Sequence, residues 1–289
     1  MEKLIIHGQK RLHGEIEVHG SKNSALPILA AAALVNGVSE IHNCPKLTDI
    51  DAAIHILMHL GCRVSRSGHT VTVDATAMNN WEVPDELMRE MRSSVVFLGA
   101  ILGRTGHAKL TTPGGCEIGL RPIDLHISAM EQLGAVLEED AGKLDFHAPN
   151  GLQGARITLS FPSVGATENI MIAAATAKGR TVITNAAREP EISDLADFLN
   201  GCGAHIHGAG DSTVIIDGVP KLSGTCHTVI PDRIAASTYL LAGAVTQGKI
   251  CVRDIVPAHI GALLPVLKEA GCDITASGRW VCLSAPPRL

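Results

Sequence analysis

Aromatic residues are scarce in this sequence, whose 289 residues include only four Phe, two Trp and one Tyr. Proteins that bind single-stranded nucleic acid commonly stack bases on aromatic rings, so this scarcity argues against that class. The 24 Lys and Arg residues are scattered and the formal net charge is −5, so no basic stripe marks a surface for nucleic acid or for an anionic membrane. An anionic ligand must therefore be held by a few well-placed cations.

Long apolar runs are absent as well. The strongest one, residues 25–35, is about one helix long and contains Pro27, so the sequence predicts no membrane span. His55 and His59 lie four positions apart, which suits two ligands of one metal ion, but no third ligand is near them in the sequence. Surface or hydrogen-bonded histidines are the expected interpretation, and the sequence predicts no metal site.

Closely paired cysteines are missing too. The cysteines form no C-x-x-C pair, and no secretory leader precedes them, a pattern that is typical of reduced thiols in a cytoplasmic protein. The eight residues are Cys44, Cys62, Cys116, Cys202, Cys226, Cys251, Cys272 and Cys282.

Aliphatic residues, in contrast, are abundant, and hydrophobic residues make up 46% of the chain. A core of Ala, Val, Ile and Leu suits helices that pack on sheets. The length of the chain suggests roughly two domains, each large enough to bury its own apolar interior.

A pattern of about 70 residues recurs four times along the chain. In each copy an apolar helix is followed by a glycine and a β-branched strand, and a second helix then ends at a glycine and leads into a hairpin. The repeat therefore has the order α-β-α-β-β and predicts an α/β fold of compact units around a pseudo-symmetry axis. The residues alone leave open a grouping of three plus one or of two plus two. The first glycines are Gly37, Gly106, Gly179 and Gly248, the second are Gly61, Gly134, Gly203 and Gly271, and the predicted hairpin strands are 63–65 with 70–74, 136–138 with 144–147, 205–207 with 213–216, and 273–275 with 280–284.

Residues 113–119 form a glycine-rich loop with Cys116 at its centre and Arg121 five positions later. Three glycines in seven residues permit positive φ values and movement, so the loop has the features of a lid that presents a reactive thiol. A glycine-rich turn with an incidental buried cysteine accounts for these residues equally well.

Seven motifs stand in order along the chain: residues 20–27, 91–94, the loop around Cys116, 121–126, 163–167, 187–192 and 231–233. Together they resemble the enolpyruvyl transferases, in the branch that acts on UDP-N-acetylglucosamine. The resemblance covers the whole sequence. The Gly-Gly-Cys loop separates this branch from the sister family that acts on shikimate 3-phosphate.

The resemblance implies an inverse α/β barrel, in which repeats pack with pseudo-three-fold symmetry and two domains contain three repeats each. Residues 22–229 would form the complete domain. Residues 1–21 and 230–289 would supply one repeat of an incomplete second domain, which would lack an aspartate near the sugar hydroxyl and several phosphate-binding arginines. An incomplete domain exposes apolar faces, so we expect aggregation, self-association or dependence on a missing piece.

The resemblance also implies the ligands and the residues that hold them. Cys116 would be the proton donor, and phosphoenolpyruvate would bind Lys22, Asn23 and Arg121. Without the resemblance, Lys22 would be interpreted as a solvated surface charge and Arg121 as an ion-pair partner of Asp124. UDP-N-acetylglucosamine would bind Arg92, Arg121, Pro122, Ile123, Asp124, Leu125, Ser163, Val164 and Gly165.

The implied reaction transfers the enolpyruvyl group of phosphoenolpyruvate to the sugar 3-hydroxyl and releases phosphate. It would be the first committed step of peptidoglycan synthesis in the cytoplasm, and so serve cell wall biogenesis, cell shape and cell division. No metal, organic cofactor, nucleic acid or membrane is implied. The alternative hypothesis is a truncated, catalytically impaired relative that only binds the nucleotide sugar, because losing a base and arginine clamps costs several orders of magnitude in rate.

Overall fold

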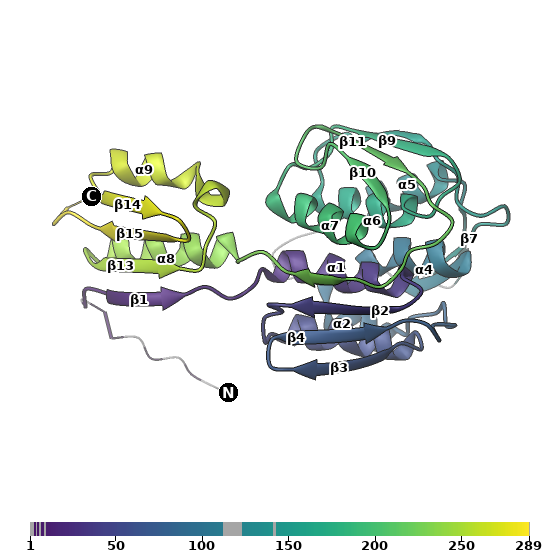
Figure 1. Ribbon diagram of the computed structural model, residues 1–289, viewed down its shortest axis with the longest axis horizontal. Coiled ribbons are helices and arrows are strands. Elements are labelled where there is room, and N and C mark those ends of the chain that lie inside the picture. Colours follow the sequence, from purple (N-terminus) through teal and green to yellow (C-terminus); the bar gives the residue numbers. More distant parts are fainter. Residues whose placement is uncertain are drawn as a thin grey trace. The chain divides into compact units, whose positions relative to one another are not determined.

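The computed structural model describes residues 3, 5, 7, 8, 10–111, 123–140 and 143–288, with the side chains of residues 92, 139 and 140 left aside. Contacts between Cα atoms divide the chain into two compact units. Unit 1 comprises residues 1–21 and 231–289, and unit 2 comprises residues 22–230. Each unit is described by itself below (Figure 1).

Unit 2 contains three successive repeats, each with its own small sheet (Figure 1). The first repeat comprises α1 (Lys22–Leu34), β2 (Val38–His42), α2 (Thr48–His59), β3 (Arg63–Ser67) and β4 (Thr70–Asp74). The second comprises α3 (Asp85–Glu90), the 3-10 helix η1 (Arg92–Val96), α4 (Phe97–Thr105), β5 (His107–Thr111), α5 (Asp124–Gln132), β6 (Val136–Asp140) and β7 (Lys143–His147). The third comprises β8 (Arg156–Thr158), α6 (Val164–Ala174), β9 (Arg180–Thr184), α7 (Pro190–Gly201), β10 (His205–His207) and β11 (Thr213–Asp217), and β12 (Cys226–Thr228) follows it.

Unit 1 contains the fourth repeat and the first strand of the chain. Its elements are β1 (His13–Glu17), α8 (Arg233–Val245), β13 (Lys249–Arg253), the 3-10 helix η2 (Pro257–Ile260), α9 (Leu263–Glu269), β14 (Asp273–Ser277) and β15 (Trp280–Ser284). Strand β1 pairs in parallel with β13, so the start of the chain completes the sheet of this last repeat.

All four sheets are built in the same way. In each, the first strand of the repeat pairs antiparallel with the last one, which forms a hairpin with the strand between them. A parallel neighbour is added beside the first strand: β12 beside β2, β8 beside β9, β1 beside β13, and a single bridge from Glu82 to Lys109 beside β5. The α-β-α-β-β order predicted from the sequence is therefore confirmed, as is the α/β fold class.

The second glycines of the four repeats share one backbone conformation. Gly61, Gly134, Gly203 and Gly271 have φ values of 96°, 91°, 99° and 92°, each just after the second helix of its repeat. A left-handed backbone conformation at this position ends a helix, and glycine adopts it at little energetic cost because it has no Cβ. The sequence pattern therefore located four helix ends correctly.

The core of unit 2 is formed by the first apolar helix of each repeat, α1, α4 and α6, which contact one another. Residues 24–34 of α1 are all buried. A Cβ atom on Gly103 of α4 would lie 2.9 Å from Leu34 Cδ1 and 3.0 Å from Thr176 Oγ1. Small residues thus let the three helices approach closely. This close packing holds the start of each helix at a defined place in space.

His126 is a buried ionisable residue of this core, on the first turn of α5. Burial lowers the pKa of its imidazole to about 4, against a smaller opposing effect of Asp124. The side chain is therefore neutral at physiological pH.

The prediction that all the cysteines are reduced is wrong for one pair. Cys251 on β13 and Cys282 on β15 are direct partners in the antiparallel register, with Cα atoms 4.0 Å apart, and a disulfide joins them. Burial raises the pKa of the Cys44, Cys62 and Cys202 thiols to about 12, so these three are poor nucleophiles and acids. Among the described residues, no helix is long and apolar enough to span a membrane.

Overpacking the helix contact should destabilise unit 2. We expect Gly103→Val to lower the free energy of unfolding by about 1–3 kcal/mol, because its side chain collides with Leu34 and Thr176. Urea denaturation measures this change. Ala262→Val, at an exposed position, is the matched control, and equal stability of both variants would contradict the close packing.

The neutral state of His126 predicts a pH dependence of stability. Between the ordinary pKa of 6.5 and the folded value of about 4, the unfolded chain takes up a proton that the folded chain does not. Stability should therefore fall as the pH drops through this window, by about 3 kcal/mol in total. Urea titrations at pH 7 and pH 4.5 should show a smaller loss for His126→Gln than for the wild type, and an equal loss would rule out this assignment.

Candidate functional site

Lys22 is the first residue of α1, and its ammonium forms an ion pair with Asp49 of α2, with Nζ 2.7 Å from Oδ2. Its side chain is 40% exposed, and Asn23 beside it is exposed. The start of α1 therefore presents a cation and an amide to solvent at the N-terminal end of a helix, where the helix dipole is positive. This arrangement suits a small anion.

A buried aspartate, Asp194, stabilises the first turn of α1. Ser24 Oγ donates a hydrogen bond to Asp194 of α7, and both side chains are buried. Asp194 also accepts a hydrogen bond from the Ile230 N–H at 3.2 Å, and its Oδ1 lies 2.9 Å from His227 Nε2. Asp194 thus fixes the first turn of α1, which carries Lys22 and Asn23.

Residues Ser163, Val164 and Gly165 form the start of α6. Ser163 is the N-cap, and its Oγ accepts a hydrogen bond from the Ala166 N–H at 3.3 Å. A shallow pocket beside this turn is lined by Pro162, Asn185, Ala186, Arg188 and Glu189. Backbone N–H groups at a helix start next to an arginine can bind phosphate oxygens.

The start of α5 lies against the start of α6. Ile123 precedes α5, Asp124 and Leu125 open it, and His126 follows. A Cβ on Gly165 would be 3.3 Å from His126 Cε1 and 3.4 Å from Nε2, so the absence of a side chain at Gly165 permits this contact. The structure therefore brings the predicted segments 123–125 and 163–165 together.

The remaining predicted site residues are only partly described. Arg92 begins η1, which contacts α6 and α1, but its side chain is outside the described part of the structure. Cys116, Arg121 and Pro122 lie outside the described residues altogether.

Glu168 is a buried acid on α6 that the sequence analysis did not single out. Its Oε1 has no hydrogen-bond partner among the described residues. Burial, followed by the nearby carboxylates of Glu191 and Glu189, raises its pKa well above the ordinary value. Burial thus favours the uncharged form of Glu168 behind the α6 start. The available signal was the polar run 167–169 inside an otherwise apolar helix.

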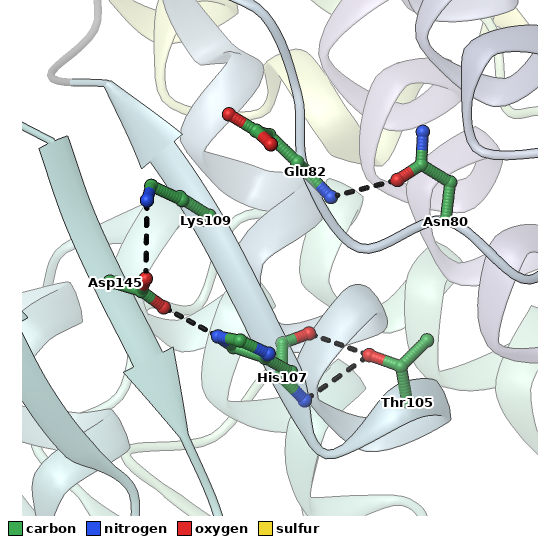
Figure 2. Close-up of polar contacts among 6 residues, drawn as sticks. All are labelled: Asn80, Glu82, Thr105, His107, Lys109 and Asp145. Carbon is green, nitrogen blue, oxygen red and sulfur yellow. Dashed lines mark hydrogen bonds and ion pairs between the residues drawn. The ribbon is translucent and has the colours of Figure 1, made fainter.

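A second group of charged residues lies on the outer face of the β5–β7 pair (Figure 2). His107 Nε2 is 2.5 Å and Lys109 Nζ is 3.4 Å from the carboxylate of Asp145, and the Trp81 ring stacks on His107 at 3.8 Å. Burial alone would raise the pKa of Asp145, but His107 and Lys109 outweigh it and lower the pKa. The group follows the C-terminal end of α4, whereas η1 with Arg92 precedes its N-terminal end, so it does not join the predicted site residues.

The histidines at the i, i+4 spacing have polar protein partners. His55 Nδ1 lies 3.5 Å from Glu90 Oε2, and His59 Nε2 lies 3.1 Å from Asn80 Nδ2. Across the described part of the chain, no group of three or more His, Cys, Asp or Glu residues is arranged to hold a metal ion.

Comparison with known proteins gives relatives along the whole chain. The family described as EPSP synthase (3-phosphoshikimate 1-carboxyvinyltransferase) matches residues 6–287. UDP-N-acetylglucosamine 1-carboxyvinyltransferase 2 of Caldanaerobacter subterraneus subsp. tengcongensis is 51% identical over 288 residues, which are 100% of this chain and 69% of the relative. UDP-N-acetylglucosamine 1-carboxyvinyltransferase 1 of Symbiobacterium thermophilum is 48% identical, over 100% of this chain and 66% of the relative.

Solved structures agree on the fold. The enolpyruvyl transferase NikO from Streptomyces tendae superposes with a TM-score of 0.86 at 25% identity, over 98% of this chain and 68% of that protein. EPSP synthase from Acinetobacter baumannii, at 19% identity, has a TM-score of 0.74 over 96% of this chain and 65% of that protein. This chain therefore spans about two thirds of the length of its relatives. On these matches the resemblance seen in the motifs is confirmed, and the chain belongs to the EPSP synthase family, among its UDP-N-acetylglucosamine 1-carboxyvinyltransferases.

Proposed function

We propose that this chain provides the sugar-nucleotide and phosphoenolpyruvate sites of a UDP-N-acetylglucosamine enolpyruvyl transferase. The observation that carries the proposal is the meeting of helix starts in unit 2, where α5 and α6 begin side by side and η1 contacts both α6 and α1. The described site residues that the family motifs assign all lie at these starts. The enzyme is favoured over a binding-only relative because the similar proteins are named as transferases.

Phosphoenolpyruvate would bind at the start of α1. The ammonium of Lys22 is already oriented by Asp49, and Ser24 is fixed by Asp194, so the cation needs little reorganisation to meet a phosphate or carboxylate. Asn23 contributes an exposed amide, and Arg121 would add a forked pair of donors.

The nucleotide sugar would bind across the starts of α5 and α6. The N–H groups after Ser163 would hold the diphosphate, and Val164 and Gly165 let the ligand approach the backbone closely. Residues 121–125 would contact the uridine, and Arg92 would add a cation from η1. The raised pKa of Glu168 favours its uncharged form, which would repel a diphosphate less than a carboxylate.

Cys116 would start the reaction as an acid. Its thiol gives a proton to the methylene carbon of phosphoenolpyruvate, so the neighbouring carbon becomes an electrophile that the sugar 3-hydroxyl attacks. A new C–O bond forms and the hydroxyl proton passes to solvent. The C–O bond to phosphate then breaks as the methyl carbon returns a proton to the Cys116 thiolate, which gives the enol ether, inorganic phosphate and the regenerated thiol.

We also propose the wider setting of this reaction. Unit 2 would be the complete three-repeat domain of the family and unit 1 one repeat of the second domain. The reaction would take place in the cytoplasm and lead to peptidoglycan, so that it supports cell shape and division.

Self-association is proposed from the face of α8. Its buried residues Ala236, Leu240 and Ala244 pack in the core of unit 1, but Ile234, Leu241 and Val245 are 49%, 47% and 72% exposed. The matching helices of unit 2, α1, α4 and α6, are covered by one another and by α2, α5 and α7. We infer that a second copy of this chain covers the corresponding face of α8.

The thiol assignment predicts selective alkylation. An epoxide that mimics phosphoenolpyruvate should add once to each chain, at Cys116, and increase its mass by that of one epoxide molecule. UDP-N-acetylglucosamine should speed this addition by about tenfold or more, because it closes the site. Intact-protein and peptide mass spectrometry measure this. Cys226→Ser, which removes the exposed thiol on β12, should react like the wild type, and Cys116→Ser should not react. Labelling of Cys116→Ser at the wild-type rate would refute the assignment.

The α8 proposal predicts a concentration-dependent dimer. Leu241→Glu combined with Val245→Glu should shift the chain to monomer, because charges on an apolar face are costly to bury. Sedimentation velocity measures the change. Met58→Glu, at an equally exposed apolar residue of unit 2, should leave the dimer intact. A wild-type chain that stays monomeric across micromolar concentrations would contradict this proposal.

A further inference from the structure

The side chain of Asn169, on α6, bonds to the backbone of a neighbouring helix. Gly99 N–H donates to Asn169 Oδ1 at 2.7 Å, and Asn169 Nδ2 donates to the Val95 carbonyl at 3.0 Å. In a regular α-helix the N–H of residue 99 would bond to the carbonyl of residue 95. The carboxamide thus bridges the two groups where η1 passes into α4, and it stabilises that junction.

The same amide makes a third hydrogen bond, to His126. Asn169 Nδ2 lies 3.0 Å from His126 Nδ1, and both side chains are buried. The orientation of the amide is set by its backbone partners, because Gly99 offers only a donor and Val95 only an acceptor. His126 Nδ1 must therefore accept, so the neutral imidazole carries its proton on Nε2.

Gly99 lies directly against Asn169, with no space for a side chain between them. A Cβ on Gly99 would lie 2.5 Å from the backbone carbonyl oxygen of Asn169 and 2.6 Å from its side-chain Oδ1. All three partners of the amide are far away in the sequence, at separations of 70, 74 and 43 residues. The contact is thus a tertiary feature, and it joins η1, α4, α5 and α6.

These elements carry the described residues of the nucleotide-sugar site. We propose that Asn169 is a positioning residue for UDP-N-acetylglucosamine: its three hydrogen bonds hold η1, the first turn of α5 and helix α6 in the arrangement that binds the ligand. The inference rests on the proposed function. Asn169 is fully buried inside the helix contact, so it acts through the segments 123–125 and 163–165 of the helices that it joins.

The variant Asn169→Asp tests this role with the least change of volume. It keeps the acceptor for Gly99 but replaces the donor to Val95 and His126 with an oxygen. We expect binding of UDP-N-acetylglucosamine to weaken by about 10–100-fold in calorimetry, because displacement of site residues by about 1 Å has effects of that size. The imidazole should also turn to the Nδ1–H tautomer or become protonated, which ¹⁵N NMR of His126 detects directly.

Two further variants separate positioning from loss of stability. Asn169→Ala removes all three bonds and should weaken binding at least as much. Leu57→Ala, in the buried face of α2, destabilises the same unit without touching the network and should bind within threefold of the wild type. Thermal melts identify any variant that fails to fold, and Asn169→Asp remains informative where Asn169→Ala does not.

Each result decides between the two proposals. A wild-type chain that does not bind UDP-N-acetylglucosamine contradicts the proposed function and this role with it. A wild-type chain that binds, together with a folded Asn169→Asp variant that binds within threefold of it, overturns the positioning role alone. A wild-type His126 with its proton on Nδ1 overturns the hydrogen-bond assignment.

Discussion

Close packing of α1, α4 and α6 is the constraint on which the rest of unit 2 depends. Each helix comes from a different repeat, and each is apolar on most of its surface, so its burial needs the other two helices together with α2, α5 and α7 around them. Glycine at 103 and alanines along α1 keep the helices near enough to exclude larger side chains. Helices fixed along their length are also fixed at their ends, and the candidate site residues lie at those ends.

The candidate site follows from that arrangement. Helix starts have unpaired N–H groups and attract anions, and here they are accompanied by Lys22 and by buried polar residues that adjust the local charge. Burial lowers the pKa of His126 to about 4, so His126 is neutral, and burial raises the pKa of Glu168 well above its ordinary value. Burial thus disfavours the charged form of both groups behind the site. The fixed positive character of the helix starts remains available to a phosphate ligand.

Much of this fold could be predicted from the sequence, because its signals are local and repeated. Glycines at helix ends indicated the repeat length, and alternating β-branched residues indicated the hairpins. In the structure one strand of each hairpin is longer than predicted, and these strands span 63–67, 136–140, 213–217 and 273–277. Contacts that depend on sheet register or on facing helices could not be found in this way. Cys251 and Cys282 meet only because β13 and β15 pair in one register, and Asn169 reaches Gly99 only because α6 packs on α4. For the site, the family motifs supplied the candidate ligand-binding residues, but the buried residues Asp194, Glu168 and Asn169 behind them became evident only in three dimensions.

The central claim is that the starts of α1, α5 and α6 in one unit form the ligand site, and backbone NMR of the ¹⁵N-labelled chain tests it most directly. UDP-N-acetylglucosamine added to the chain should shift the amide signals of residues 123–125 and 163–165, and phosphoenolpyruvate added next should shift those of residues 22–24. Saturable shifts that instead cluster on the β5–β7 face around His107 and Asp145, with the helix starts unchanged, would contradict the account.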